Sequence, residues 1–192
     1  MRYILFSLNE ILPSAVILIP FYAIVCKVRM HDVRRTIFCW MFSTYLCAVY
    51  ALAGLPNITY IRFDVSCNLI PFRDMLNGLR STLQNVLLFV PLGIFLPLLW
   101  SRYTSIKNTL LFGFGMSLTI ELLQMFTYRA TDVNDLMTNT LGTLLGFCLA
   151  IVPVKKLAGF HNESSNRDKE IWLSVSASFG VMFFLQPVVL LL

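Results

Sequence analysis

Carboxylates and amides that interrupt apolar sequence between residues 117 and 146 are the groups with the greatest potential for chemistry. At about 100° per residue, one face of a helix here would carry a polar and small set: Asp132, Asp135, Asn139, Gly142, Thr143 and Gly146. Upstream, Glu121 and Gln124 share a second stripe with Ser117 and Tyr128 in a largely apolar segment. A carboxylate there is costly unless it faces a protein interior or water, so Glu121 is a candidate functional residue.

The composition indicates the setting of these residues. Apolar residues make up 57% of the chain and charged residues 13%, and the mean hydropathy is +0.74. Soluble domains are closer to one half apolar and one quarter charged. Mainly apolar runs, each long enough to cross a hydrocarbon core, recur at residues 8–26, 36–53, 82–100, 108–127, 132–154 and 171–192. The sequence therefore predicts an all-α integral membrane protein, one domain over residues 1–192, with a bundle of about six transmembrane helices (four to six).

The distribution of Lys and Arg predicts the orientation. Of the 15 such residues, most lie in the first, third and fifth loops. By the positive-inside rule these loops are cytoplasmic, so both termini and the second and fourth loops are expected outside. The net charge of +5 is then a signal of topology, and we predict no nucleic-acid binding.

The segment before and within the third run has further signals. Residues 74–83 carry apolar side chains at helical spacing, which predicts an amphipathic segment on the membrane surface in the extracytoplasmic loop. Ser81-Thr82-Leu83-Gln84 fits a capping box and predicts a helix start there. Pro91 and Pro97 each remove a backbone donor, so we expect the third helix to be kinked.

Cysteine and histidine give no sign of a cofactor. The five cysteines contain no CxxC pair, and their spacing predicts no disulfide framework. His31 and His161 lie in different loops without ligand spacing. We therefore predict neither a metal site nor a cofactor.

The predicted topology brings the polar residues to one level of the membrane. Asn85 lies near the outer end of the third helix, Glu121 and Gln124 lie in the outer third of the fourth, and Asp135 and Asn139 belong to the start of the fifth. Asn68 and Arg129 come from the two outer loops, and Asp132 precedes the fifth helix. These residues predict a polar, ligand-binding pocket towards the outer leaflet.

More ordinary roles also fit several of these residues. Asp132 fits a helix N-cap, and Asp135 fits the first helical turn, where carboxylates stabilise free amides and the helix dipole. Asn85 fits an interhelical hydrogen bond as well as a ligand contact. Gly142 and Gly146 have GxxxG spacing, and we expect them and Gly93 to mediate close helix packing.

The same residues resemble the VanZ-like family in several blocks of matching order and spacing. The blocks are Asn68-Leu-Ile-Pro-Phe72, Asn85-Val-Leu-Leu-Phe-Val-Pro-Leu-Gly93, Glu121-Leu-Leu-Gln124, Arg129, Asp132-Val-Asn-Asp135, Asn139-Thr-Leu-Gly142 and Gly146. The resemblance covers residues 68–146, and residues 171–192 lie outside it as an additional transmembrane helix.

The resemblance implies a small multi-pass protein of the bacterial plasma membrane. It implies lowered sensitivity to lipoglycopeptides such as teicoplanin, or a more general modulation of the cell envelope. Lipoglycopeptides act at the outer leaflet on peptidoglycan precursors and insert an acyl chain into the membrane. Besides membrane lipids, the expected ligand of the polar pocket is the drug or a lipid-linked peptidoglycan precursor.

Two other functions compete with binding. The first is an intramembrane enzyme that modifies a lipid-linked envelope substrate, with Glu121 as acid or base and with Asp132 and Asp135 on a divalent ion. No nucleophile with a neighbouring base is evident, so we expect binding rather than catalysis. The second is a small transporter or flippase with proton coupling through Glu121, although the sequence has no internal repeat.

Overall fold

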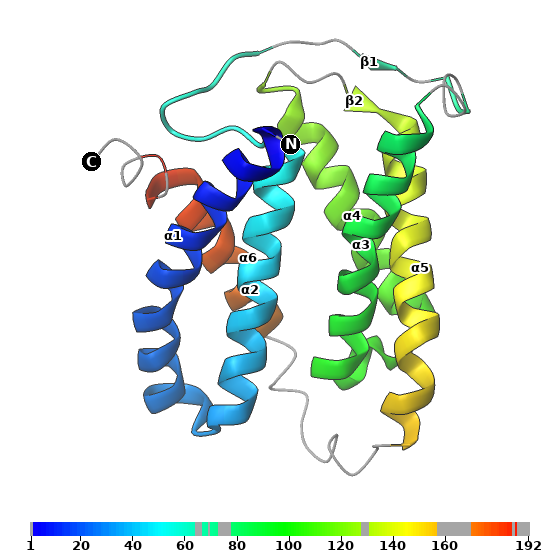
Figure 1. Ribbon diagram of the computed structural model, residues 1–192. Helices are drawn as coiled ribbons and strands as arrows, with labels where there is room; N and C mark the ends of the chain where they lie inside the picture. Colours follow the sequence, from blue (N-terminus) through cyan, green and yellow to red (C-terminus); the bar gives the residue numbers. More distant parts are fainter. Residues whose placement is uncertain are drawn as a thin grey trace. The chain divides into compact units, whose positions relative to one another are not determined.

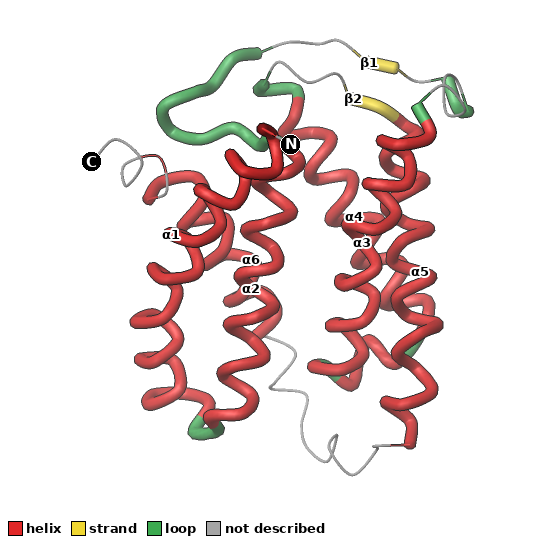
Figure 2. Tube along the Cα trace, viewed as in Figure 1, coloured by secondary structure: helices red, strands yellow, loops and turns green. Residues whose placement is uncertain are grey.

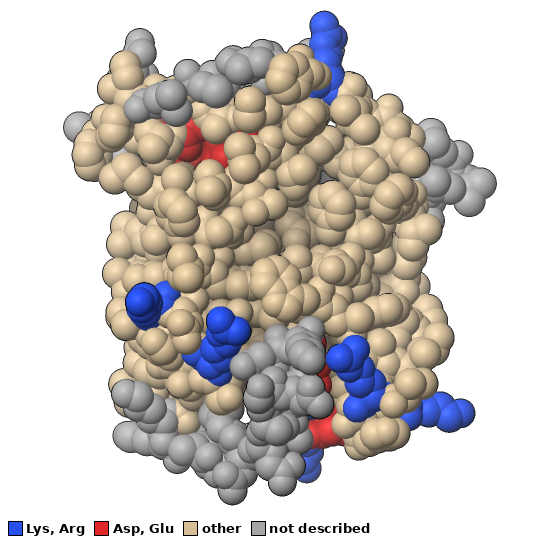
Figure 3. Space-filling model, turned by 180° about the vertical axis from the view of Figure 1, so that it is seen from behind, with Lys and Arg blue, Asp and Glu red and all other residues tan. Residues whose placement is uncertain are grey.

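The computed structural model describes residues 2–63, 67–68, 70–72, 78–127, 131–156, 170–185 and 187. In this part of the chain the architecture is helical apart from two short strands (Figures 1 and 2). Within these described ranges, five helices are long and apolar enough to cross a membrane, which confirms the prediction of an all-α integral membrane protein. The face shown in Figure 3 is dominated by uncharged surface, as lipid-facing helices require.

The helices form two compact units, and each is described by itself. Unit 1 comprises residues 1–62 and 169–192, and unit 2 comprises residues 63–168. Unit 1 contains α1 (Arg2–Val25), α2 (Val33–Ala53) and α6 (Glu170–Gly180). A π-helical turn follows α1 at Cys26–Met30, and another follows α6 at Val181–Leu185. The membrane domain predicted over residues 1–192 thus contains two groups of helices.

Hydroxyl groups hold α6 against α1 and α2 within unit 1. Ser174 and Ser178 are four residues apart, lie on one side of α6 and are fully buried. The Tyr22 hydroxyl lies 2.8 Å from Ser174 Oγ and 2.6 Å from Ser43 Oγ. Ser178 Oγ donates to the carbonyl of Ser43 at 3.0 Å. Because these polar groups bond to one another, they can be buried between apolar helices.

α6 is shorter than the sixth span predicted over residues 171–192. Its 11 α-helical residues and the 5 of the following π-helical turn extend roughly 24 Å, less than a hydrocarbon core of about 30 Å. Arg35 of α2 pairs with Glu170 at 2.7 Å, and the amide of Ile58 donates to the carbonyl of Phe183 at 3.0 Å. Five long spans agree with the predicted range of four to six, and residues 188–192 lie outside the described residues.

Unit 2 contains three long helices: α3 (Leu79–Leu99), α4 (Ile106–Gln124) and α5 (Val133–Lys156). A 3-10 turn at Ser101–Thr104 joins α3 to α4. Two short strands, β1 (Cys67–Asn68) and β2 (Thr131–Asp132), pair in parallel with Asn68 opposite Asp132. Figure 1 shows both strands at the end of the unit where α3 and α5 begin and α4 ends. This end therefore carries most of the predicted site residues.

The first turn of α3 differs from the predicted capping box. The helix begins at Leu79, and its N-cap is Gly78, which has no side chain to cap it. Ser81 and Thr82 lie inside the first turn, and their hydroxyls donate to the carbonyl of Gly78 at 2.7 and 3.1 Å. The capping-box prediction is wrong because these hydroxyls satisfy a carbonyl of the helix instead of its free amides.

Two other predictions concern the same helix and its approach. α3 runs as one helix through Pro91 and Pro97, and the kink stays a prediction. Part of the predicted amphipathic segment, residues 74–77, lies outside the described residues. Leu79 and Leu83 belong to the first turns of α3, where about half of each side chain is exposed.

Glycines allow the backbones of α3 and α5 to touch. A Cβ atom on Gly142 would overlap the carbonyl oxygen of Val86, and one on Gly146 would overlap that of Val90. In the opposite direction, a Cβ on Gly93 would overlap the carbonyl oxygen of Thr143. Small residues at such a contact permit close packing of membrane helices. The start of α5 is therefore held at a defined position against α3.

Candidate functional site

Glu121 lies in the last turn of α4, and its carboxylate holds the segment that leads into α5. One carboxylate oxygen, Oε2, accepts the backbone N–H of Asp132 at 2.9 Å. The carbonyl of Glu121 accepts the hydroxyl of Thr131 at 3.0 Å. The side chain is only 3% exposed. Glu121 is therefore a positioning residue that joins the end of α4 to β2, and not a group on the surface.

Asp132 is the residue before α5, and both of its carboxylate oxygens have hydrogen-bond donors. Oδ1 accepts the backbone N–H of Asn134 at 2.8 Å, which is the geometry of a helix N-cap. Oδ2 accepts the side-chain amide of Asn68 at 3.2 Å. Asp132 thus caps α5 and binds β1 at the same time.

The stretch that follows β1 is attached to α5 by a residue that was not among the predicted site residues. The side-chain oxygen of Asn134 accepts the backbone N–H of Phe72 at 2.7 Å, and Asn134 is buried. Phe72 has a left-handed backbone with φ of 63°, which turns its N–H out of a regular strand. The signal in the sequence was an amide two residues after a capping Asp, inside the block Asp132-Val-Asn-Asp135.

A second polar layer lies one helical turn below Glu121. The amide of Asn139 donates to Ser117 Oγ at 2.9 Å, and this bond joins α5 to α4. Ser117 precedes Glu121 by four residues and Asn139 follows Asp135 by four, so the two layers lie on the same helix faces. Asn139 is 5% exposed, and its Oδ1 has no hydrogen-bond partner among the residues that the structure describes. Ser117 shared the stripe of Glu121 in the sequence, although it was not predicted as a site residue.

Three more predicted site residues lie in α4, α5 and α3, and a fourth is not described. Gln124 is buried at the end of α4, where its carbonyl accepts both the N–H and the hydroxyl of Thr127. Asp135 is half-buried in the first turn of α5. Asn85 is half-buried in the second turn of α3, without a hydrogen bond of its side chain to any described residue. Arg129 lies outside the described residues.

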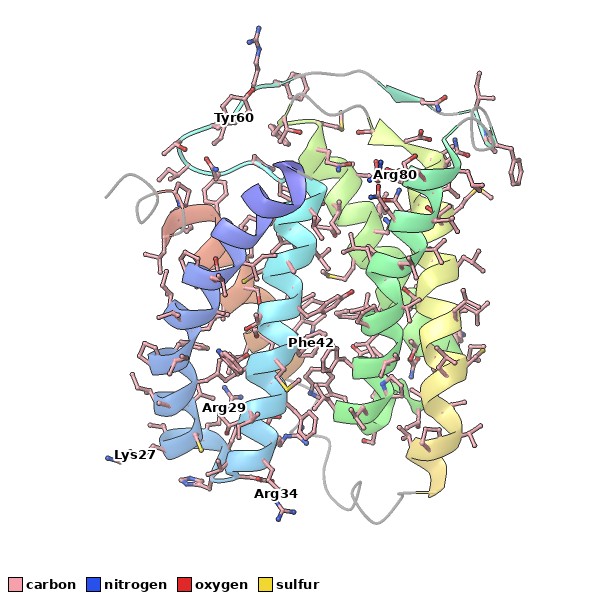
Figure 4. All side chains as sticks on the ribbon, in the orientation of Figure 1. Lys27, Arg29, Arg34, Phe42, Tyr60 and Arg80 are labelled. Carbon is pink, nitrogen blue, oxygen red and sulfur yellow. The ribbon has the colours of Figure 1, made fainter. Side chains whose placement is uncertain are left out.

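The structure adds a cation at this end of unit 2. Arg80 is exposed in the first turn of α3, and Figure 4 shows it near the end where β1 and β2 lie. Arg80 was not among the predicted site residues. Asp132, Asp135 and Asn85 are half-buried here, so an approaching ligand would meet them before it met the buried Glu121.

The groups at the end of unit 2 where α3 and α5 begin are suited to hydrogen bonding. This end carries carboxylates and amides, some of which accept hydrogen bonds from backbone N–H groups while others are partly exposed. Among the described residues, no three His, Cys, Asp or Glu side chains lie close enough together to hold a metal ion. The arrangement can thus accept and donate hydrogen bonds to a polar group at the membrane surface.

Comparison with known proteins identifies the family. Residues 33–155, more than half of the chain, match the VanZ/LLP1 family. The chain belongs to this family. The match contains the whole region of resemblance at residues 68–146 and extends it to α2. The protein is therefore a multi-pass membrane protein of the VanZ/LLP1 family, and the predicted membership is confirmed.

Comparison with individual proteins gives a match to a named relative. The chain is 34% identical to Protein VanZ of Enterococcus faecium over 105 residues, which cover 54% of this chain and 59% of that protein. The alignment thus leaves a large part of both VanZ-family proteins unmatched. No solved structure matches the chain.

Proposed function

We propose that this VanZ-family protein binds the polar part of an envelope ligand through the end of unit 2 where α3 and α5 begin. The ligand is a lipoglycopeptide such as teicoplanin or a lipid-linked peptidoglycan precursor, and the result is lowered sensitivity to the drug or a changed cell envelope. The membrane is the bacterial plasma membrane. The orientation follows from the positive-inside rule, which assigns this end to the extracytoplasmic side.

The hydrogen bond between Glu121 and the backbone of Asp132 is the observation that carries this proposal. A buried carboxylate in a membrane-spanning helix is costly and marks a functional site by default. Here it orients the residue that caps α5 and that also binds Asn68 of β1. A site held in this way from three elements is pre-organised for a ligand, and pre-organisation lowers the entropic cost of binding.

The proposed roles differ among the candidate residues. Glu121 and Asn139 position the others from inside the unit. Asp135 and Asn85 are half-buried, and we assign them to direct contact with the ligand. The complete proposed set is Asn68, Asn85, Glu121, Gln124, Arg129, Asp132, Asp135 and Asn139.

The test compares two drugs in a sensitive bacterial host that expresses the chain. Inhibitory concentrations of teicoplanin and vancomycin are measured, because vancomycin lacks the lipid tail. Expression should raise tolerance to teicoplanin more than tolerance to vancomycin. Asp135→Asn should remove most of this difference. The matched control is Asp32→Asn, which alters the N-cap carboxylate of α2 in unit 1. This variant should retain the difference in tolerance between the two drugs.

Equal changes for both drugs, or no change for either, would contradict the drug-linked proposal. Glu121→Gln then separates binding from catalysis. If wild-type protein alters a purified lipid-linked precursor chemically and Glu121→Gln does not, the function is enzymatic. If tolerance falls in Glu121→Gln and no altered product is found with either protein, binding is supported.

A further inference from the structure

Unit 1 has an apolar groove between α1 and α2. Its volume is about 290 Å³, and it is lined by Ile19, Tyr22, Ala23, Thr36, Ile37 and Trp40. Tyr22 and Thr36 are buried and form the floor, whereas Ile19 and Ile37 are 52% and 50% exposed and form the walls. The groove thus opens away from the core of the unit, with aliphatic and aromatic side chains along it.

The two helices that form the groove are bonded to each other at one of its ends. Trp40 of α2 donates its indole N–H to the carbonyl of Ala15 on α1 at 3.0 Å. At the other end α1 continues into the π-helical turn Cys26–Met30, which is capped by the N–H of His31 donating to the carbonyl of Cys26 at 2.8 Å. A hydrogen bond at one end and a short connection at the other thus define the groove.

Basic residues lie at the end of the groove where α1 and α2 join. Lys27 follows the groove residue Ala23 by four positions and lies in the π-helical turn that continues α1, whereas Arg34 precedes Ile37 by three in the first turn of α2. Both side chains are exposed, and Figure 4 shows them extending outward at this end of unit 1. Arg29, two residues after Lys27, points to the opposite side of the turn.

These cations are not neutralised within the hairpin. The carboxylate of Asp32 accepts the backbone N–H groups of Arg34 and Arg35 at 3.0 and 3.2 Å, so it serves as the N-cap of α2. Arg35 pairs with Glu170. Among the described residues, Lys27 and Arg34 have no carboxylate partner, so both offer positive charge at the end of the apolar groove.

We propose that unit 1 binds one anionic phospholipid in this place. An acyl chain lies in the groove between α1 and α2, and the phosphate of the headgroup contacts Lys27 and Arg34. Apolar lining fits the hydrocarbon chain, and each Lys or Arg near a membrane surface attracts anionic lipid. By the positive-inside rule this lipid belongs to the cytoplasmic leaflet. The proposal does not depend on the function of unit 2.

Quenching of Trp40 fluorescence provides the test, because this side chain lines the groove. The full chain carrying Trp100→Phe and Trp172→Phe, in which Trp40 is the remaining tryptophan, is placed in phosphatidylcholine vesicles. Increasing fractions of brominated phosphatidylglycerol or brominated phosphatidylcholine are then added. Brominated phosphatidylglycerol should quench Trp40 at a lower fraction than brominated phosphatidylcholine does. The double variant Lys27→Gln, Arg34→Gln should weaken the apparent affinity for phosphatidylglycerol on the order of 30-fold, at about 1 kcal/mol for each charge.

Two further variants separate the parts of the proposed site. Arg29→Gln removes a charge from the same hairpin on the other side and should keep the preference for phosphatidylglycerol. Ala23→Phe fills the groove and should reduce quenching by either lipid. Native mass spectrometry of the same proteins should show a retained phosphatidylglycerol in wild type and Arg29→Gln only, and an unchanged circular dichroism spectrum verifies folding.

Three outcomes would overturn the proposal. Equal quenching by the two lipids in the wild-type chain would exclude a headgroup preference. If Arg29→Gln lost as much of the preference for phosphatidylglycerol as the double variant does, the preference would come only from general attraction between surface charge and anionic lipid. Unchanged quenching in folded Ala23→Phe would show that no acyl chain occupies the groove.

Discussion

Replacing Gly146 with alanine should destabilise unit 2. A Cβ at this position would overlap the carbonyl oxygen of Val90, and it would lie 2.9 Å from the carbonyl carbon of Val90 and 3.0 Å from the Cα of Gly93. All three atoms belong to the backbone of α3, which cannot move aside as a flexible side chain can. The helices must separate, and overpacking of this kind costs about 1 to 3 kcal/mol.

The matched control is Gly115→Ala in α4 of the same unit. A Cβ on Gly115 meets no atom within 4 Å, so only helix propensity changes. Alanine is favoured over glycine in a helix interior by up to about 1 kcal/mol. Gly115→Ala should therefore be at least as stable as the wild type, whereas Gly146→Ala should be less stable than the wild type.

The assay is unfolding of the purified full chain by titration with a denaturing detergent. The change is followed through the fluorescence of Trp100, which is fully buried in unit 2, in a background carrying Trp40→Phe and Trp172→Phe. Gly146→Ala should unfold at a lower detergent fraction than the wild type. If Gly146→Ala and Gly115→Ala were equally stable, the close contact between α3 and α5 would be refuted.

Three further predictions concern individual hydrogen bonds and the buried ion pair. Asp132→Ala should lower the free energy of unfolding by about 1 to 2 kcal/mol in the same titration, because it removes the N-cap of α5, whereas Asp132→Asn should retain most of the capping. Ser117→Ala should cost about 1 kcal/mol, since it leaves the buried amide of Asn139 without its partner; a neutral result would contradict the bond. Arg35→Met should cost about 3 to 5 kcal/mol by leaving Glu170 buried and unpaired, and the added change Glu170→Leu should restore most of that loss when circular dichroism follows the same unfolding.

The hydropathy of the chain was sufficient to predict most of the fold. Each long span coincides with a mainly apolar run, because length and apolarity are what a hydrocarbon core demands of a helix. The sixth run, at residues 171–192, lies partly outside the described residues, and its full span stays a prediction. The capping box at Ser81 failed because the pattern fits more than one position along a helix start.

The candidate site was partly visible in the sequence. Glu121 was found because a carboxylate is conspicuous in apolar sequence, and Asp132 was found because it stands before a helix. Their hydrogen bond was not predictable, because it joins the side chain of one residue to the backbone of the other across a turn. Asn134 was missed since an amide near a helix start is common and has no pattern of its own.

The sequence by itself determined the class of the protein, its long membrane helices and its family, because composition, length and the order of the motif blocks are properties of the chain. Only the tertiary structure decided which polar groups are buried and what each of them binds. The physical reason is that a buried carboxylate or amide is stabilised by the donors and acceptors that folding brings near it. For Glu121 that donor is an amide of the next element, and for Lys27 and Arg34 the neighbouring groove exists only once α1 and α2 have packed.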